Sequence, residues 1–263
     1  MIPKELAITV AYQAGEILRK NIGKITANVV EDKQPFDYVT DIDKACEQLI
    51  INSIKGHFPD HEILAEESGK NQNTHNYRWI IDPLDGTTNF IHGYPHSSIS
   101  IALQKDDEVI LGVIYDPYRD ELYHAEKGRG AYCNQKRIRV SKRANVNNCL
   151  ISTGFPFKKR HLLEQYWKAL SAIFMEVSGI RRTGSAALDL AYVACGRFDG
   201  FWELKLSPWD IAAGSIIIEE AGGKITDVEG KNNHIRTGDV IASNVIIHDF
   251  LLNKIQKFFP ENP

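Results

Sequence analysis

The sequence has few of the features that mark secreted, membrane-embedded or disulfide-stabilised proteins. Its 263 residues include only four cysteines, which lie far apart and form no CxxC pair: Cys46, Cys133, Cys149 and Cys195. This pattern is typical of reduced thiols and argues against a disulfide framework or a zinc knuckle. No apolar run approaches the roughly 18 residues of a membrane-spanning helix, and the N-terminus lacks the form of a signal peptide. We therefore expect a cytoplasmic protein without membrane contact.

A strong charge of either sign is absent as well. The chain has 31 Lys and Arg against 34 Asp and Glu, a formal net charge of −3, and 43% of its residues are hydrophobic. These values indicate a folded protein rather than a disordered one, with a surface that as a whole does not attract polyanions. Two local basic stretches are exceptions, Lys136 to Arg143 and Lys158 to His161. A solvated face of a hairpin or loop explains each of them, and a nucleic-acid contact is the alternative.

Hydrophobic periodicity predicts a mixture of helices and strands in the first half of the chain. Apolar residues recur at helical spacing over residues 3–22, and again after "TDID", where the pattern stops before Pro59. The stretch "RWIID" predicts a buried strand that enters a loop. Alternating stretches predict further strands in "SISIAL", "EVILGVIYD" and "ELYHA", and "KGRGAYCNQKRIRV" predicts turns and another strand.

The pattern changes after about residue 145, where small-residue helices become frequent. The sequence predicts strands in "CLISTGF" and "VIASN", a helix over residues 161–178 and a final helix carrying Leu251, Ile255, Phe258 and Phe259. It also predicts a helix from an N-cap at Ser185 to Gly196, and one capped by Asp210 that ends at Gly222 and Gly223. With no internal repeat, two mixed α/β lobes are expected, over residues 1–144 and 145–263.

The stretch "WIIDPLDGTTNF", from Trp79 to Phe90, contains the first candidate functional residues. Asp-Pro and Asp-Gly are common turn dipeptides, so a plain turn explains Asp82 and Asp85 taken singly. Two carboxylates 4 Å apart repel by about 1 kcal/mol in water and about 4 at an effective dielectric of 20, so gathering them requires a cation or a shared proton. Hard oxygen ligands favour magnesium, calcium or manganese over zinc. The amides of Gly86 and Thr87 are candidates to hold a phosphate.

Further acidic residues follow other elements, and each has a simple structural explanation. Glu66, in "LAEES", follows a predicted strand and is explained as a surface acid. Asp210, in "SPWDIAAG", is explained as an N-cap, and Asp43 as the acidic partner in a capping box with Thr40.

Together, these stretches resemble a known family. "WIIDPLDGTTNF", "LAEES" and "WDIAAGSIIIEEAGG" are similar to the signature stretches of the inositol monophosphatases, which are magnesium-dependent, lithium-sensitive sugar phosphatases. The resemblance extends over nearly the whole chain. The segment "RRTGSAALDLAYVACGRFDGFWE" is most similar to the bacterial branch, which includes a protein that also serves in the ribosomal-RNA antitermination complex.

The resemblance implies an α+β fold, the layered αβαβα sandwich of the sugar phosphatases, usually as a homodimer. The N-terminal lobe, residues 1–144, would contain most metal ligands, and the C-terminal lobe, residues 145–263, would contribute Asp210 and the sugar-side pocket. Two or three Mg²⁺ ions are implied, with Mn²⁺ as a substitute.

The resemblance also implies roles for individual residues. The metal ligands would be the carboxylates of Glu66, Asp82, Asp85 and Asp210 and the backbone carbonyl of Leu84. Thr87 would bind a metal-bound water, and Glu66 would accept its proton. Asp43 would lie one shell out, oriented by Thr87 or holding a weaker third ion. The substrate would be contacted by Asp85, Gly86, Thr87, Arg181, Gly184, Ser185, Ala186, Glu203 and Asp210.

The reaction implied is hydrolysis of myo-inositol 1-phosphate or a similar small polyol phosphate. Two alternatives stay open. One keeps the reaction and changes the substrate, to histidinol phosphate, fructose 1,6-bisphosphate or a nucleotide 3′-phosphate. The other is an accessory role in ribosomal-RNA antitermination, with RNA polymerase or antitermination factors as partners. The chain has Ser185 where many relatives have threonine, and "LSPWD" differs from the animal enzymes, so the sugar pocket is expected to differ more than the metal site.

Overall fold

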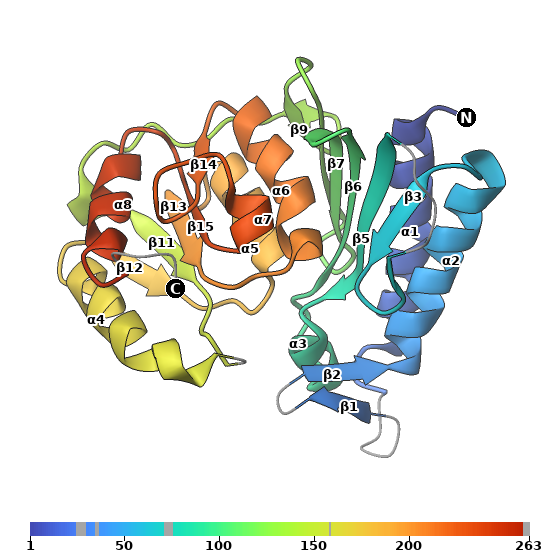
Figure 1. The fold of residues 1–263 in the computed structure, drawn as a ribbon, viewed down its shortest axis with the longest axis horizontal. Helices are drawn as coiled ribbons and strands as arrows, with labels where there is room; N and C mark the ends of the chain where they lie inside the picture. Colours follow the sequence, from blue (N-terminus) through green and yellow to red (C-terminus); the bar gives the residue numbers. More distant parts are fainter. Residues whose placement is uncertain (25–29, 35–36, 71–75, 158, 260–263) are drawn as a thin grey trace.

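The structure, a computed structural model, describes residues 1–24, 30–34, 37–70, 76–157 and 159–259. Its elements form five layers in the order helices, sheet, helices, sheet, helices (Figure 1). This arrangement is the αβαβα sandwich that the resemblance implied. The candidate functional residues come from both sheets and from the helices between them, so the layers determine where the candidate site lies.

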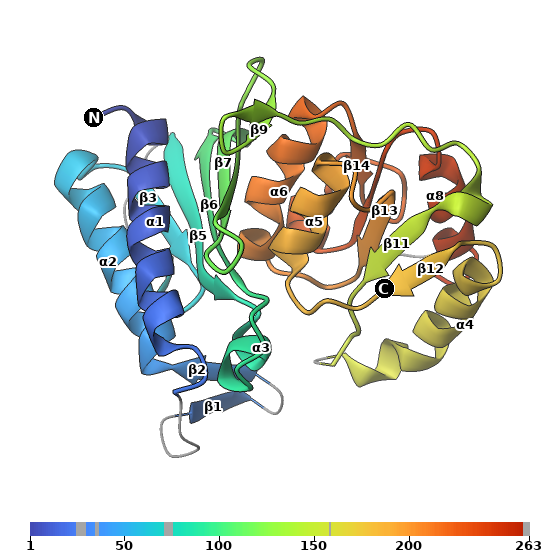
Figure 2. The same ribbon diagram turned by 180° about the vertical axis from the view of Figure 1, so that it is seen from behind.

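The first layer consists of two long helices, α1 (Pro3–Asn21) and α2 (Asp41–His57), which cover the outer face of the larger sheet (Figure 2). Both match predicted helices. α1 buries Leu6, Val10, Ala14 and Leu18, which recur on one face at helical spacing. α2 begins inside "TDID", because Thr40 is its N-cap and accepts from the amides of Ile42 and Asp43. A hairpin of β1 (Val30–Gln34) and β2 (Asp37–Thr40) precedes it.

The larger sheet has eight strands in the order β10-β9-β8-β7-β6-β5-β3-β4. All neighbours are antiparallel except β3 and β5, which run parallel. The strands are β3 (Glu62–Ala65), β4 (Gly69–Lys70), β5 (Tyr77–Asp85), β6 (Ser98–Lys105), β7 (Glu108–Asp116), β8 (Glu121–Glu126), β9 (Ala131–Cys133) and β10 (Lys136–Arg137). The predicted strands are confirmed, and β5 continues beyond "RWIID" to Asp85.

The smaller sheet has five strands in the order β12-β11-β13-β15-β14, with β11 parallel to both its neighbours and the other pairs antiparallel. Two of its strands were predicted, β11 (Leu150–Thr153) and β15 (Val240–Ser243). The others are β12 (Gly179–Arg181), β13 (Gly200–Glu203) and β14 (Lys224–Thr226). Like β11 and β15, these strands have only three or four residues, a length that shows no clear alternating pattern.

The helices of the second half are α4 (Leu163–Phe174), α5 (Ala186–Ala194), α6 (Pro208–Glu220), the short α7 (His234–Thr237) and α8 (His248–Gln256). Short 3₁₀ turns precede β11 (Val146–Asn148) and α4 (Arg160–Leu162). α4 and α8 form the last layer and α5 and α6 the middle one. The predicted end of α4 at residue 178 was wrong, because the chain turns after Phe174 to enter β12. α8 likewise ends before Phe258 and Phe259.

The prediction of Asp210 as an N-cap was also wrong. The N-cap of α6 is Ser207, Pro208 occupies the first helical position, and Asp210 lies three residues inside the cap. The Asp210 carboxylate accepts a hydrogen bond of 2.7 Å from the Ser207 amide. The helix thus begins earlier than predicted, and Asp210 stays in its first turn.

The middle helices are rich in small residues because a sheet covers them on both sides. A Cβ at Gly112 of β7 would lie 2.5 Å from the Ala213 carbonyl of α6, and one at Gly214 would lie 2.5 Å from Leu190 of α5. Both glycines therefore permit close packing of a helix against its neighbour. A helix buried on every side lacks a polar face, which explains the unbroken apolar run in α6. Both helices begin near the end of β5. The Ala187 amide of α5 donates to Asp85, and the Trp209 carbonyl oxygen of α6 accepts from the Ser100 hydroxyl of the neighbouring strand β6.

Candidate metal and phosphate site

A bulge at the end of β5 brings Asp82 and Asp85 to one face of the sheet. Side chains alternate along a regular strand, so residues three apart point to opposite faces. Here Asp82 pairs with Ser100 and Asp85 pairs with Ser98, so three steps along β5 match two steps along β6. The extra residue reverses the alternation, as a β-bulge does.

Three carboxylates converge at this bulge. Asp82, Asp85 and Asp210 each place one oxygen within 4.8 Å of the others, and theirs is the one cluster of three candidate ligands among the residues that the structure describes. Asp210 reaches the site from the first turn of α6. Asp85 is held in place by the start of α5, where its Oδ2 accepts from the Ser185 hydroxyl at 2.5 Å and the Ala187 amide at 2.8 Å.

The electrostatics of these carboxyl groups favour a bound cation. Burial raises the pKa of Asp82 well above its ordinary value, and the negative charges of Glu66, Asp85 and Asp210 raise it further. Burial also raises the pKa of Asp85, while the hydrogen bonds from Ser185 and from α5 amides oppose the rise. A divalent cation among these oxygens would stabilise their charged forms, and the all-oxygen set suits Mg²⁺, Ca²⁺ or Mn²⁺.

Thr87 links the bulge to the buried start of α2. Its Oγ1 lies 3.2 Å from Oδ1 of Asp43 and 3.1 Å from the carbonyl oxygen of Leu84, and its single hydrogen can be donated to only one of them at a time. Asp43 also accepts from the Thr40 amide at 2.9 Å through its other oxygen. The capping-box explanation of Asp43 and its predicted contact with Thr87 are therefore both correct.

Gly86 joins β5 to the short helix α3 (Thr87–Ile91) in a conformation that requires glycine. Its φ is +95°, and an added Cβ would lie 3.1 Å from the carbonyl oxygens of Gly184 and His96. Because Gly86 has no side chain, the loop that contains Gly184 can lie close to the end of β5.

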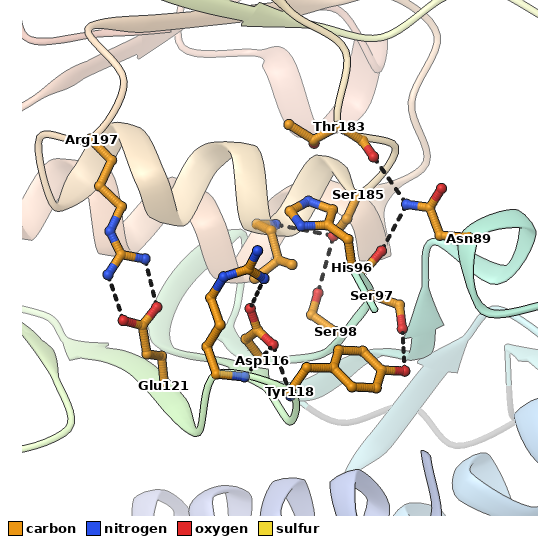
Figure 3. Close-up of polar contacts among 12 residues, drawn as sticks. Asn89, His96, Ser97, Ser98, Asp116, Tyr118, Glu121, Thr183, Ser185 and Arg197 are labelled. Carbon is orange, nitrogen blue, oxygen red and sulfur yellow. Dashed lines mark hydrogen bonds and ion pairs between the residues drawn. The ribbon is translucent and has the colours of Figure 1, made fainter. Parts of the chain in front are cut away.

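Side-chain hydrogen bonds reinforce this junction. The Asn89 amide donates to the carbonyl oxygens of His96 at 2.7 Å and Thr183 at 3.0 Å, and the hydroxyls of Ser98 and Ser185 lie 3.3 Å apart (Figure 3). The parts of the site that come from distant stretches of the chain are thereby fixed relative to one another.

Glu66 follows β3 and lies beside the cluster without belonging to its tightest part. Its amide donates to the carbonyl oxygen of Ile81 at 3.2 Å, and its charge contributes to the raised pKa of Asp82. Leu84 has a buried side chain, and its amide donates to Asp82 at 2.9 Å.

A cavity of about 110 Å³ adjoins the carboxylates. It is lined by Asp85, Gly154, Arg182, Gly184, Ser185, Ala186, Asp189, Glu203, Leu206 and Asp210. The lining includes the four residues that were predicted to face the sugar: Gly184, Ser185, Ala186 and Glu203. Ser185 faces the cavity with its hydroxyl already engaged by Asp85.

Arg181 is not among the lining residues. It is exposed on β12, and its guanidinium donates to the carbonyl oxygen of Ile180. Its neighbour Arg182 lines the cavity instead, with its guanidinium 5.2 Å from the ring centre of Phe157. Asp189 also lines the cavity and was not predicted, although its position four residues after Ser185 on a predicted helix places both on one face.

Glu203 also lines the cavity. Burial raises the pKa of Glu203 to about 8, against the lowering effect of Arg182. A Cβ at Gly154 would lie 2.0 Å from the Glu203 carboxyl group, so this position accepts no larger residue without displacing Glu203.

The chain is similar to known proteins over nearly its whole length. The sequence model of the inositol monophosphatase family matches residues 4–258. The chain is 41% identical over 260 residues to the Nus factor SuhB of Pseudomonas aeruginosa, covering 97% of this chain and 96% of that protein.

Solved structures are similar over the same length. The crystal structure of the extragenic suppressor protein SuhB from Bartonella henselae gives a TM-score of 0.93 at 43% identity, covering 96% of this chain and 98% of that one. The inositol monophosphatase from Anabaena (Nostoc) sp. PCC 7120 gives 0.87 at 42% identity, covering 97% and 95%. Among the described residues, no helix is both long enough and apolar enough to span a bilayer.

Proposed function

This chain belongs to the inositol monophosphatase family, and from that premise we propose that it hydrolyses myo-inositol 1-phosphate, or a similar small polyol phosphate, with Mg²⁺ as cofactor. The observation that carries the proposal is the convergence of Asp82, Asp85 and Asp210 beside a cavity. A phosphatase needs such a set of oxygens because they bind the divalent cations that offset the negative charge of the phosphate group.

The residues fit hard divalent cations. The carboxylates of Glu66, Asp82, Asp85 and Asp210 and the carbonyl of Leu84 would hold two or three Mg²⁺ ions, and Mn²⁺ can replace them. When bound, such ions neutralise the phosphate oxygens and lower the pKa of the attacking water.

The chain's own groups orient the reactants. The Thr87 hydroxyl can direct its hydrogen to Asp43 and offer its oxygen lone pairs to the attacking water, and Glu66 would accept the proton that the water loses. The amides of Gly86 and Thr87 would hold phosphate oxygens. Gly184, Ser185, Ala186 and Glu203 would face the polyol, and Arg181 would lie farther from it than Arg182 does.

The direct test compares phosphate release by the wild-type protein and by Asp85→Asn, with myo-inositol 1-phosphate and Mg²⁺. Asp249→Asn changes an exposed acid far from the cavity and serves as the matched control. We expect loss of activity in Asp85→Asn and in excess chelator, and wild-type activity in the control. Equal activity in all three proteins, or full turnover in chelator, would defeat the proposal.

Substrate identity is tested by a panel of esters. Histidinol phosphate, fructose 1,6-bisphosphate and a nucleotide 3′-phosphate should be hydrolysed less efficiently than the inositol ester, and lithium should inhibit. A higher kcat/KM for any of these three esters would leave the proposed phosphatase reaction unchanged and make that ester the preferred substrate.

A second candidate function is an accessory role in ribosomal-RNA antitermination, favoured by the 41% identity to a protein named as a Nus factor. Part of the first basic stretch supports the fold, because Arg143 pairs with the buried Asp199 at 3.0 Å. Lys136, Arg137 and Arg139 are exposed and open to partners, while Lys158 lies outside the described residues. If this role exists, Asp85→Asn should still co-purify with RNA polymerase or elongation factors. If neither the wild-type protein nor Asp85→Asn pulls down these partners, this second candidate function is contradicted.

We also propose a homodimer of this two-lobed chain, lobes 1–144 and 145–263, working in the cytoplasm. The dimer is supported by large apolar side chains exposed along α4 and beside it: Phe157, Leu163, Trp167, Phe174 and Met175. Four free thiols suit a reducing compartment. Light scattering should give twice the mass of the chain for the wild-type protein. Trp167→Glu should lower the measured mass towards that of a single chain.

A further inference from the structure

Glu47 is a buried carboxylate of α2 whose two oxygens accept hydrogen bonds from one turn of the chain. It is 4% exposed, and its Oε2 accepts from the Glu67 amide at 2.8 Å while its Oε1 accepts from the Ser68 amide at 2.9 Å. A carboxylate is buried at a large cost in free energy unless hydrogen bonds compensate it. Both of these donors lie in the turn between β3 and β4, so Glu47 stabilises one particular conformation of that turn.

The same turn contains Glu66, the proposed proton acceptor. The Glu66 amide donates to the carbonyl oxygen of Ile81 on β5 at 3.2 Å, and the next two amides donate to Glu47. The backbone of Glu66 is therefore held on one side by the strand that contains Asp82 and on the other side by α2. Because the rotamers open to a side chain depend on its backbone, these three hydrogen bonds restrict where the Glu66 carboxylate can point.

A second carboxylate on the same face of α2 holds the other side chain that was proposed to contact the attacking water. Asp43 lies one turn before Glu47, and residues four apart face the same side of a helix. Its Oδ1 is 3.2 Å from Oγ1 of Thr87. One helix thus fixes both the Thr87 hydroxyl and the turn that contains Glu66.

We infer that Glu47 is a positioning residue, which holds Glu66 beside the carboxylate cluster, where Glu66 would ligate the metal and accept the proton of the attacking water. The inference rests on the proposed phosphatase function and adds a residue to it that contacts neither the substrate nor the metal. Glu47 acts through Glu66 alone, so its removal should have no effect on a protein whose Glu66 is already changed.

The scaffold offers a matched control for this contact. Glu220 lies at the end of α6 opposite to Asp210, and its two oxygens accept from the amides of Gly128 and Gly130 at 2.6 Å each. It is thus also a helical glutamate that holds a turn of the larger sheet, but that turn contains none of the candidate site residues. Glu220→Gln therefore reports what the loss of such a contact does to the fold alone.

The test combines amide hydrogen exchange with a double-mutant cycle. Glu47→Gln keeps the length of the side chain and has only one acceptor oxygen, and Glu47→Leu removes both acceptors at similar volume. Each change is made in the wild-type protein and in Glu66→Gln. The measurements are amide exchange in residues 66–68, thermal melting, Mn²⁺ affinity, and kcat and KM for myo-inositol 1-phosphate at saturating Mg²⁺.

We expect Glu47→Gln to accelerate exchange of the Glu67 and Ser68 amides and to lower both kcat and Mn²⁺ affinity by about 10- to 100-fold. KM should change little, because Glu66 does not line the cavity. Glu47→Leu should lose at least as much. In Glu66→Gln, neither change should lower kcat or Mn²⁺ affinity further. Glu220→Gln should keep the wild-type kcat and Mn²⁺ affinity.

Three results decide against the inference or against its premise. Equal kcat and Mn²⁺ affinity in Glu47→Gln and the wild-type protein, or losses that add to those of Glu66→Gln, would overturn the inference and leave the proposed function intact. If Glu66→Gln turns over too slowly to measure, or Glu47→Leu does not fold, the cycle of Glu47→Gln measured by Mn²⁺ affinity decides by the same criterion. A wild-type protein that releases no phosphate would overturn the proposed function, and the Mn²⁺ cycle would still decide whether Glu47 positions Glu66.

Discussion

The buried acidic residues of the scaffold differ from the carboxylates of the cleft, Glu66, Asp82, Asp85 and Asp210, in how their charge is compensated. Asp116 is fully buried, with the Arg119 guanidinium 2.8 Å from one oxygen and the Tyr118 and Arg119 amides on the other. Asp82, in contrast, is surrounded by three carboxylates that raise its pKa, and no lysine or arginine pairs with it in the described part of the chain. The scaffold thus supplies its own counter-charge, while the cleft leaves that charge to be supplied by a ligand.

The largest expected effect comes from removing one cleft carboxylate. Asp82→Asn should lower kcat/KM by more than about 100-fold, beyond the effect typical of residues outside a metal's direct ligands. In chelator the same change should raise the free energy of unfolding by about 1 kcal/mol or more, because a repulsion disappears. Phosphate release and urea unfolding measure the two quantities. Lower stability in chelator would mean that Asp82 is compensated like a scaffold acid.

The reciprocal change in the scaffold should have the opposite signature. Asp199→Asn weakens the pair with Arg143 and should lower the free energy of unfolding by about 2–4 kcal/mol. Activity per folded molecule should stay at the wild-type value. Unchanged urea unfolding, or a loss of turnover without a loss of stability, would contradict the proposed difference between the scaffold acids and the cleft acids.

Thr87 tests how far the cleft depends on its uncharged groups. Thr87→Val removes the hydroxyl that contacts Asp43 and Leu84 and should lower kcat by about 10- to 100-fold. Thr87→Ser retains the hydroxyl and should lose much less. Steady-state kinetics at saturating Mg²⁺ compare the two, and equal losses would show that the methyl group matters rather than the hydroxyl.

A smaller expected effect is the joint dependence of the protein's stability on pH and on Mg²⁺. The folded state raises the pKa of Asp82 and Asp85, so it binds protons that the unfolded chain has lost, and in chelator stability should fall as pH rises above about 4. Mg²⁺ binds the deprotonated carboxylates, so the rise in Tm that it causes should grow over the same range. Melting curves with chelator and with Mg²⁺ between pH 5 and pH 8 measure this. A Mg²⁺ effect independent of pH would contradict the account.

The sequence predicted the elements better than the geometry of the site. Long periodic segments such as α1 and β7 have local patterns that identify them. The bulge between Asp82 and Asp85 has no such pattern, because it is a mismatch in pairing with β6 and depends on the partner strand. The candidate acids were recognised by motif, yet their convergence follows from that bulge.

Side chains that line the cavity from the second half of the chain were harder to find. Arg181 and Arg182 are adjacent, and which of them faces the cavity depends on where β12 ends. Asp189 lies in an otherwise apolar helix, and only the structure shows that it lines the cavity.

The central claim is that the cleft carboxylates require divalent cations between them. Anomalous diffraction from crystals grown with Mn²⁺ tests it most directly. The account predicts manganese peaks coordinated by Asp82, Asp85 and Asp210, and their disappearance in Asp85→Asn crystals. Wild-type crystals with no anomalous peak beside these side chains would contradict it.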